Sequence, residues 1–189
     1  MRSRFLPVVS PLAAALVAAG CASGQPARAP GEADQYVTLI VRGATNQAKL
    51  EGNELYGPRL RLSFLSDGIR GVIDDQIASF DVREGGKIVG TVGGQPVDLY
   101  VRQGPDWMTV NGLFRGQLSD LRVNADSIQG NVARCGYTLR AQGADPGSFA
   151  GRRSCRGMPE DAVLSLPPAL LARPAPERVV VLATLLASR

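Results

Sequence analysis

The chain has 189 residues, with 22 glycines, 13 prolines, 3 cysteines, no histidine and a formal charge of +4. The lack of histidine excludes Ser-His-Asp and Cys-His nucleophile systems and imidazole metal sites, and three cysteines are too few for a four-thiolate zinc site. The length fits one domain. No apolar run reaches the roughly 20 residues that a membrane-spanning helix needs.

Residues 1–20 have the pattern of a secretory signal peptide. Basic residues at positions 2 and 4 precede an apolar stretch over 5–19, and small residues lead directly to Cys21. The sequence Ala18-Ala19-Gly20-Cys21 resembles the lipobox of bacterial lipoproteins, with alanine where that motif most often has leucine. The resemblance implies cleavage after Gly20, diacylglycerol on the Cys21 thiol and acylation of the new N-terminus, with palmitate among the attached chains. An uncleaved anchor and an ordinary signal peptide with a chance cysteine are the alternatives.

The same resemblance gives an expectation for location. Ala22, and not aspartate, follows the modified cysteine, and the sorting preference of the family then favours the outer membrane. We therefore expect a protein of the bacterial cell envelope that contacts the membrane through its lipid anchor.

The two other cysteines form an even pair. In an exported chain, Cys135 and Cys155 are expected to form a disulfide, because the compartment is oxidising. Closing a loop of about 20 residues would stabilise the fold by about 3 kcal/mol in the chain-entropy model. Two unpaired thiols are the alternative.

Residues 21–35 are predicted to be the lipidated cysteine and a flexible tether. They are rich in alanine, proline and glycine and contain no large apolar residue, so they cannot bury enough surface to become ordered. Without residues 1–20 the chain has 19 basic and 17 acidic residues. This small excess of positive charge gives no argument for a nucleic-acid partner.

A glycine repeat dominates the rest of the sequence. Apolar-x-Gly triplets end at Gly52, Gly71, Gly90, Gly112, Gly130 and Gly151, at intervals of 19, 19, 22, 18 and 21 residues. Between them lie segments in which apolar and polar residues alternate, such as 97–101, and short stretches of turn-forming residues. Each repeat unit is therefore predicted to form a β-hairpin with one buried face. The glycine lies on that face, and we expect the strand to bend there.

The repeat predicts the fold class. Residues 36–155 are expected to form a mainly β domain of roughly ten to twelve strands, an antiparallel meander of repeated hairpins that closes as a barrel or a sandwich. A parallel β-solenoid, whose coils have a similar period, is the alternative.

Residues 156–189 are predicted to be helical and to pack on the β-domain. Met158–Ser165 begins with proline and acidic residues, as helices often do, and a second helical pattern follows Pro176 and is apolar nearly all round. Such a helix is buried, or it meets a partner or lipid. We expect it to plug or cap the β-domain, and docking to an envelope protein or to the membrane surface is the alternative.

The sequence offers few candidates for chemistry, and no catalytic, cofactor-binding or metal-ligating residue is predicted. Asp81, Asp98 and Asp120 lie between apolar neighbours and should face water. An acid/base site would need two of them to converge in a cleft. The pair Asp74-Asp75 is expected to form a turn, with a weak calcium site as a remote alternative.

One basic cluster stands out, formed by Arg152, Arg153 and Arg156 around Cys155. It reads as plain surface, with contact to anionic head groups as the alternative. Taken together, these features favour a non-catalytic envelope lipoprotein that acts as a binding or structural module. A carrier of small apolar ligands in a barrel cavity and a carboxylate-based hydrolase are the alternatives.

Overall fold

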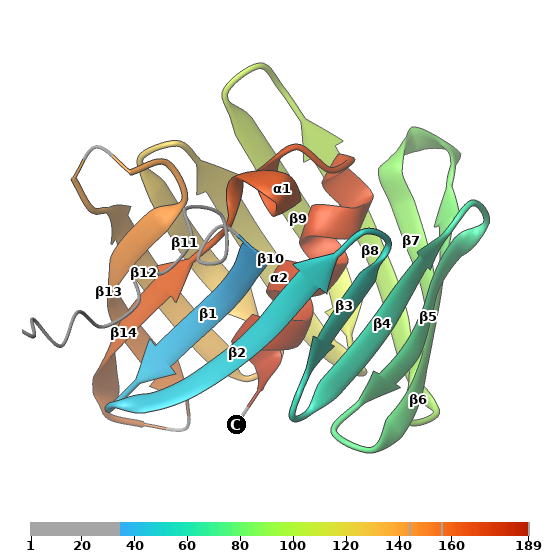
Figure 1. Ribbon diagram of the computed structural model, residues 1–189, viewed down its shortest axis with the longest axis horizontal. Helices are drawn as coiled ribbons and strands as arrows, with labels where there is room; N and C mark the ends of the chain where they lie inside the picture. The colour runs from blue at the N-terminus through green and yellow to red at the C-terminus, as the bar shows by residue number, and fades with distance from the viewer. Residues whose placement is uncertain (1–34, 144, 156, 189) are drawn as a thin grey trace, which may run out of the picture.

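The computed structural model describes residues 35–143, 145–155 and 157–188. They form a closed barrel of fourteen strands, in which every strand runs antiparallel to its neighbours in the chain and β1 closes on β14 (Figure 1). The strands are β1 (Tyr36–Val41), β2 (Ala44–Glu51), β3 (Glu54–Gly57), β4 (Leu60–Leu65), β5 (Gly68–Ile73), β6 (Gln76–Arg83), β7 (Lys87–Val92), β8 (Gln95–Gln103), β9 (Trp107–Phe114), β10 (Gln117–Asn124), β11 (Ser127–Val132), β12 (Cys135–Ala141), β13 (Ser148–Cys155) and β14 (Pro159–Ser165). The predicted antiparallel meander is confirmed, and it closes as a barrel. The predicted number of ten to twelve strands was too low.

The last strand corrects the prediction for residues 156–165. Pro159–Ser165 is strand β14 and not the start of a helix. Ala162 and Leu164 are buried while Asp161 and Val163 are exposed, which is the period of a strand. Because β14 pairs with both β13 and β1, this segment closes the barrel.

Five of the predicted glycines occupy equivalent places, one in each of the strands β5, β7, β9, β11 and β13. Each lies opposite a large buried residue of the preceding strand, in the pairs Leu62–Gly71, Phe80–Gly90, Leu99–Gly112, Leu121–Gly130 and Leu139–Gly151. A Cβ at any of these glycines would lie 1.9–2.1 Å from a backbone carbonyl oxygen of that strand. Glycine is therefore required by close backbone approach, and the row leaves inward space beside each large residue.

Gly52 does not belong to this row. It lies in the turn between β2 and β3, with a φ of +55° and open space around its Cβ position. The triplet match at Leu50-Glu51-Gly52 was therefore misleading, because a hairpin turn also selects glycine when it needs a positive φ.

A helical segment follows the barrel wall and turns back into the barrel. It consists of α1 (Pro168–Leu171) and α2 (Ala175–Ala187). Residues 179–186 of α2 are buried on every side, and α2 packs on β8, β9 and β11 (Figure 1). The expectation that this helix plugs the β-domain agrees with this position, whereas docking on a partner would need an exposed apolar face.

The number of strands explains why a helix is needed inside. Fourteen strands about 4.8 Å apart and tilted by about 40° enclose a cylinder about 28 Å across. Side chains from the wall fill a barrel of about eight strands, but not one of this width. A helix about 10–12 Å across occupies the remaining space. Neither helix in the described part of the chain has the length and apolar content to cross a membrane.

Candidate functional site

The two ends of the barrel are built from different sets of connections. One end, which we call the arginine mouth, carries the connections 42–43, 58–59, 74–75, 93–94, 115–116, 133–134 and 156–158. The other, the entry mouth, carries 52–53, 66–67, 84–86, 104–106, 125–126 and 142–147, and α1 follows β14 there. Several turns of the arginine mouth are two-residue turns with positive φ at both positions, such as Arg115 (53°) and Gly116 (69°). These turns fix the backbone tightly.

Charge is divided unequally between the two ends. The connections of the arginine mouth include Arg42, Arg59, Arg115 and Arg134 beside Asp74 and Asp75. The connections of the entry mouth contain five acidic residues and no lysine or arginine, the acids being Asp67, Glu84, Asp106, Asp126 and Asp145. The connections are therefore mainly basic at one end of the barrel and acidic at the other.

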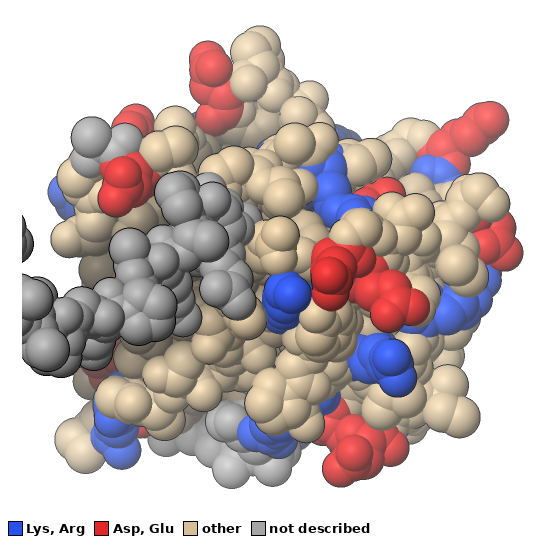
Figure 2. Space-filling view, viewed as in Figure 1, with Lys and Arg blue, Asp and Glu red and all other residues tan. Residues whose placement is uncertain are grey.

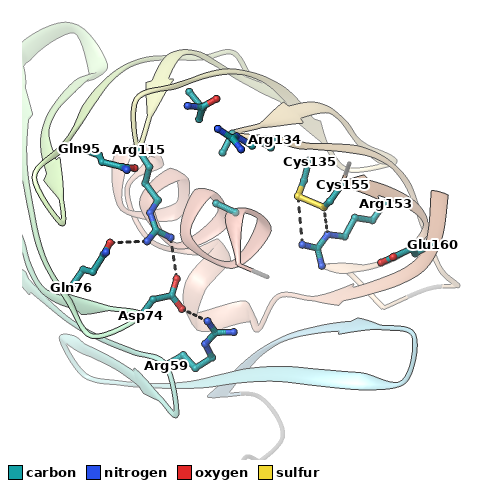
Figure 3. Close-up of a pocket in the computed structure, with 13 residues that line it drawn as sticks. Arg59, Asp74, Gln76, Gln95, Arg115, Arg134, Cys135, Arg153, Cys155 and Glu160 are labelled. Atoms are coloured by element: carbon teal, nitrogen blue, oxygen red, sulfur yellow. Dashed lines mark hydrogen bonds and ion pairs between the residues drawn. A yellow bond between two sulfur atoms is a disulfide. The ribbon is translucent and has the colours of Figure 1, made fainter. Parts of the chain in front are cut away.

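A cavity of about 610 Å³ opens at the arginine mouth (Figure 3). It is lined by Arg59, Asp74, Gln76, Gln95, Arg115, Gln117, Ala133, Arg134, Cys135, Arg153, Cys155, Glu160 and Ala187. A second cavity of about 440 Å³ shares Arg59, Arg153 and Glu160 with it and adds Arg42. The end of α2 contributes Ala187 to the first cavity and Ser188 to the second, so the helix that fills the barrel also forms part of the floor of its mouth.

Asp74 organises one wall of the first cavity. Its carboxylate accepts from Arg115 at 3.0 Å and pairs with Arg59 at 2.8 Å, and the second terminal nitrogen of Arg115 donates to the Gln76 amide oxygen at 2.9 Å (Figure 3). The Arg115 and Asp74 side chains are less than a quarter exposed. One carboxylate thus holds two guanidinium groups, from the β3–β4 turn and the β9–β10 turn, and the three side chains together keep a net positive charge.

Arg153 and the disulfide form the opposite wall. Cys135 and Cys155 are bonded, as predicted, with an S–S distance of 2.02 Å. Arg153 is only 7 % exposed, and its guanidinium donates to Cys155 Sγ at 2.7 Å and to Cys135 Sγ at 3.5 Å (Figure 3). It also donates to the carbonyl of Ser188. Arg153 therefore ties the end of α2 to strands β12 and β13.

A buried tyrosine holds the same end of the helix. The hydroxyl of Tyr137 donates to the carbonyl of Leu186 at 2.5 Å. Burial raises the pKa of Tyr137 to about 12, although the nearby Arg153 acts in the opposite direction. The neutral phenol is therefore the form that the folded protein stabilises.

The comparisons with known proteins give no guide to this site. The chain matches no protein-family model, no curated protein and no solved structure. Any functional assignment therefore rests on the geometry of the chain itself. Among the residues that the structure describes, no three acidic or cysteine side chains gather as metal ligands.

The acids singled out in the sequence lie outside this cavity. Asp98 pairs with Lys87 at 3.3 Å, and Asp81 pairs with Arg70 at 2.7 Å, both between residues on the outer side of the wall. Asp120 is exposed on β10. The three lie on alternate strands and do not converge on one cleft.

The predicted basic cluster is divided by the strand that carries it. Arg152 points outward and pairs with Asp161 at 3.2 Å, whereas Arg153 points inward to the disulfide. Successive residues of a strand face opposite sides, so the sequence run does not form one surface patch. Arg156 and Cys21 lie outside the described residues.

The arginines of the mouth were missed by the sequence analysis. Their signal was available, because alternate connections of a meander lie at the same end of a barrel. Comparing alternate turns would have shown arginine at one end and acids at the other. The inward direction of Arg153 had no such signal, since most inward positions nearby are apolar or glycine.

Proposed function

We propose that the protein is a non-catalytic lipoprotein of the bacterial envelope that binds its ligand at the arginine mouth. The observation that carries the proposal is the position of α2, which fills the barrel and leaves the described cavities at this mouth. A polar, concave site on a rigid scaffold, with the main chain fixed by tight turns, is suited to binding.

The anchor and the site belong to opposite ends of the barrel. Strand β1 starts at Tyr36 beside the entry mouth and ends at Val41 beside the arginine mouth. The proposed acylated Cys21 and its tether therefore join the barrel at the acidic end. The proposed tether has 14 residues and as a coil would reach about 20 Å. It would hold the barrel near the bilayer, with the arginine mouth at the far end.

An apolar carrier is less well supported. Inward side chains of the wall, such as Phe80 and Leu99, are fully buried, and α2 occupies the space between the walls. A ligand in the lumen would have to displace this helix together with the hydrogen bonds of Tyr137 and Arg153. The polar mouth needs no such rearrangement.

Labelling and crosslinking test the two parts of the proposal. In a Gram-negative host supplied with radioactive palmitate, the full chain should be labelled and membrane-bound, and Cys21→Ser should remove the label. The matched control Cys135→Ser/Cys155→Ser should keep it. An unlabelled wild-type chain would contradict the lipoprotein assignment.

For the binding role, a photocrosslinking residue is placed at Gln117, on the cavity, or at Arg140, on the outer face of β12. A specific adduct in intact envelopes is expected at position 117 and not at 140. Equal labelling at both positions would contradict a binding role for the mouth.

A further inference from the structure

The two cavities of the arginine mouth carry more positive than negative charge. Five arginines line them against two acids, the arginines being Arg42, Arg59, Arg115, Arg134 and Arg153 and the acids Asp74 and Glu160. The whole chain without residues 1–20 has an excess of only two basic residues. A local excess of three at one mouth is therefore a concentration of charge and not a reflection of composition.

Both acids are already engaged by other arginines. Asp74 pairs with Arg59 and Arg115, and Glu160 pairs with Arg42 at 3.1 Å. Among the described residues, no carboxylate lies within 4.0 Å of the guanidinium of Arg134 or of Arg153. Within the described part of the chain, two guanidinium charges of the first cavity thus lack a carboxylate partner.

Of the two arginines, Arg153 has the greater need of a counter-charge, because its side chain is buried. Its hydrogen-bond acceptors are the Ser188 carbonyl and two sulfur atoms, which are all neutral. The end of a helix carries about half a negative charge, so capping α2 compensates only part of the guanidinium charge. A buried charge without a full counter-charge is unfavourable, and an anion in the cavity would supply it.

The disulfide joins the two backbone segments that carry these arginines. Arg134 directly precedes Cys135, and Arg153 donates to the sulfurs of both cysteines. In Figure 3, Arg134 lies on the wall between Arg115 and the disulfide. Amide side chains from the other hairpins, Gln76, Gln95 and Gln117, line the same cavity.

We infer that the first cavity is a site for a small phosphate-bearing anion, held by Arg134 and Arg153 and surrounded by the glutamine amides. A phosphate group carries up to two charges and several acceptor oxygens, which matches two guanidinium groups without carboxylate partners and nearby amide donors. The cavity of about 610 Å³ has the size of small-molecule sites. This inference deepens the proposed binding role and rests on it for its biological setting.

Calorimetric titration of the purified full chain in detergent with inorganic pyrophosphate, at physiological salt, tests the site. We expect saturable binding with one ligand per chain. Arg134→Gln should weaken it about tenfold, the typical contribution of a charge-assisted hydrogen bond. The matched control Arg140→Gln removes the same charge from the outer face of the same strand region and should change the affinity less than about twofold, as expected for a distant exposed charge.

Arg153→Lys provides a second variant that retains the charge but loses the planar group, and it should also weaken binding. Its thermal unfolding is recorded in parallel, so that a folding defect is recognised; Arg134→Gln decides the matter if Arg153→Lys does not fold. The absence of saturable binding at millimolar pyrophosphate would overturn the inference, and so would equal weakening by Arg134→Gln and Arg140→Gln.

Two further phosphates identify the source of the group. Tighter binding of glycerol 3-phosphate than of inorganic phosphate indicates a lipid head group, and the reverse order indicates a soluble phosphate compound; both support the site. Palmitate labelling is independent of this titration. Pyrophosphate binding with an unlabelled chain would refute the lipoprotein assignment alone, and a labelled chain without binding would refute the phosphate site alone.

Discussion

The two mouths of the barrel are built from the same hairpins, but their connections differ in length and in charge. At the entry mouth the connections are two to six residues long and acidic, and Arg173, between α1 and α2, is engaged by Glu177 at 2.7 Å, by the ring of Phe64 at 4.3 Å and by the carbonyl of Gly52. At the arginine mouth the connections are two or three residues long, and basic side chains exceed their acidic partners. The difference teaches that a repeated hairpin provides the scaffold, while the residues of alternate turns give each end its chemistry.

The surface charge supports this division only in part. In Figure 2, acidic and basic residues are interspersed over the visible face of the barrel wall. Cross-strand pairs such as Arg70–Asp81 and Lys87–Asp98 likewise bring opposite charges together on the strands. The contrast between the ends therefore resides in the turns and not in the strands.

The largest expected effect concerns the floor of the arginine mouth. Leu185 of α2 is fully buried, whereas Leu118 on the outer face of β10 is 79 % exposed. Leu185→Asp would bury a carboxylate inside the barrel and should lower the free energy of unfolding by at least about 4 kcal/mol. Leu118→Asp should change it by less than about 0.5 kcal/mol, as for other surface substitutions. Urea denaturation measures both, and a similar small effect at the two positions would place α2 outside the barrel.

A second prediction uses pH to probe the link between the wall and the helix. The pKa of Tyr137 is raised from 10.0 to about 12 in the folded state. Its contribution to stability is therefore complete below pH 10 and is lost as the pH rises through about 12, by about 2 kcal/mol at that pH.

Comparing the pH dependence of unfolding of the wild type and Tyr137→Phe isolates this loss, which the variant should lack. Tyr100→Phe, at a half-exposed tyrosine of the outer face, should retain it. Identical alkaline profiles for the wild type and Tyr137→Phe would contradict the buried hydrogen bond to Leu186.

The smallest expected change in unfolding free energy comes from replacing one acid at each mouth. Asp74 pairs with two arginines in a partly buried site, while Asp67 is 73 % exposed and lies 3.9 Å from Arg70. Asp74→Asn should lower the free energy of unfolding by about 1 kcal/mol, and Asp67→Asn should leave it nearly unchanged. Thermal unfolding at low salt measures both. A larger effect at Asp67 would reverse the comparison between the mouths.

The strands could be predicted from the sequence because each hairpin repeats the same local pattern. Alternation, turn residues and glycine spacing are visible in each hairpin and predict an antiparallel meander. The same local logic failed at Pro159–Ser165, where proline and two acids suggested a helix start. This segment forms a strand because it pairs with β1, more than 110 residues away in the chain. The local sequence does not reveal that pairing.

The candidate site was harder to predict because its residues meet only after closure. Arg59, Arg115 and Arg134 belong to separate hairpins, and Arg153 joins them because β13 turns it inward. The location of α2 depends in turn on the number of strands, since a narrower barrel has no room for a helix. The disulfide was predicted correctly because counting cysteines needs no knowledge of the fold.

Hydrogen exchange of the backbone amides of α2 tests most directly whether the helix fills the barrel and ends at the arginine mouth. The account predicts that the amides of residues 179–186 exchange as slowly as those of the central strands, at a rate set by global unfolding. Exchange of these amides at rates near those of an unfolded peptide, while the strands remain protected, would show that α2 lies outside the barrel and would contradict the account.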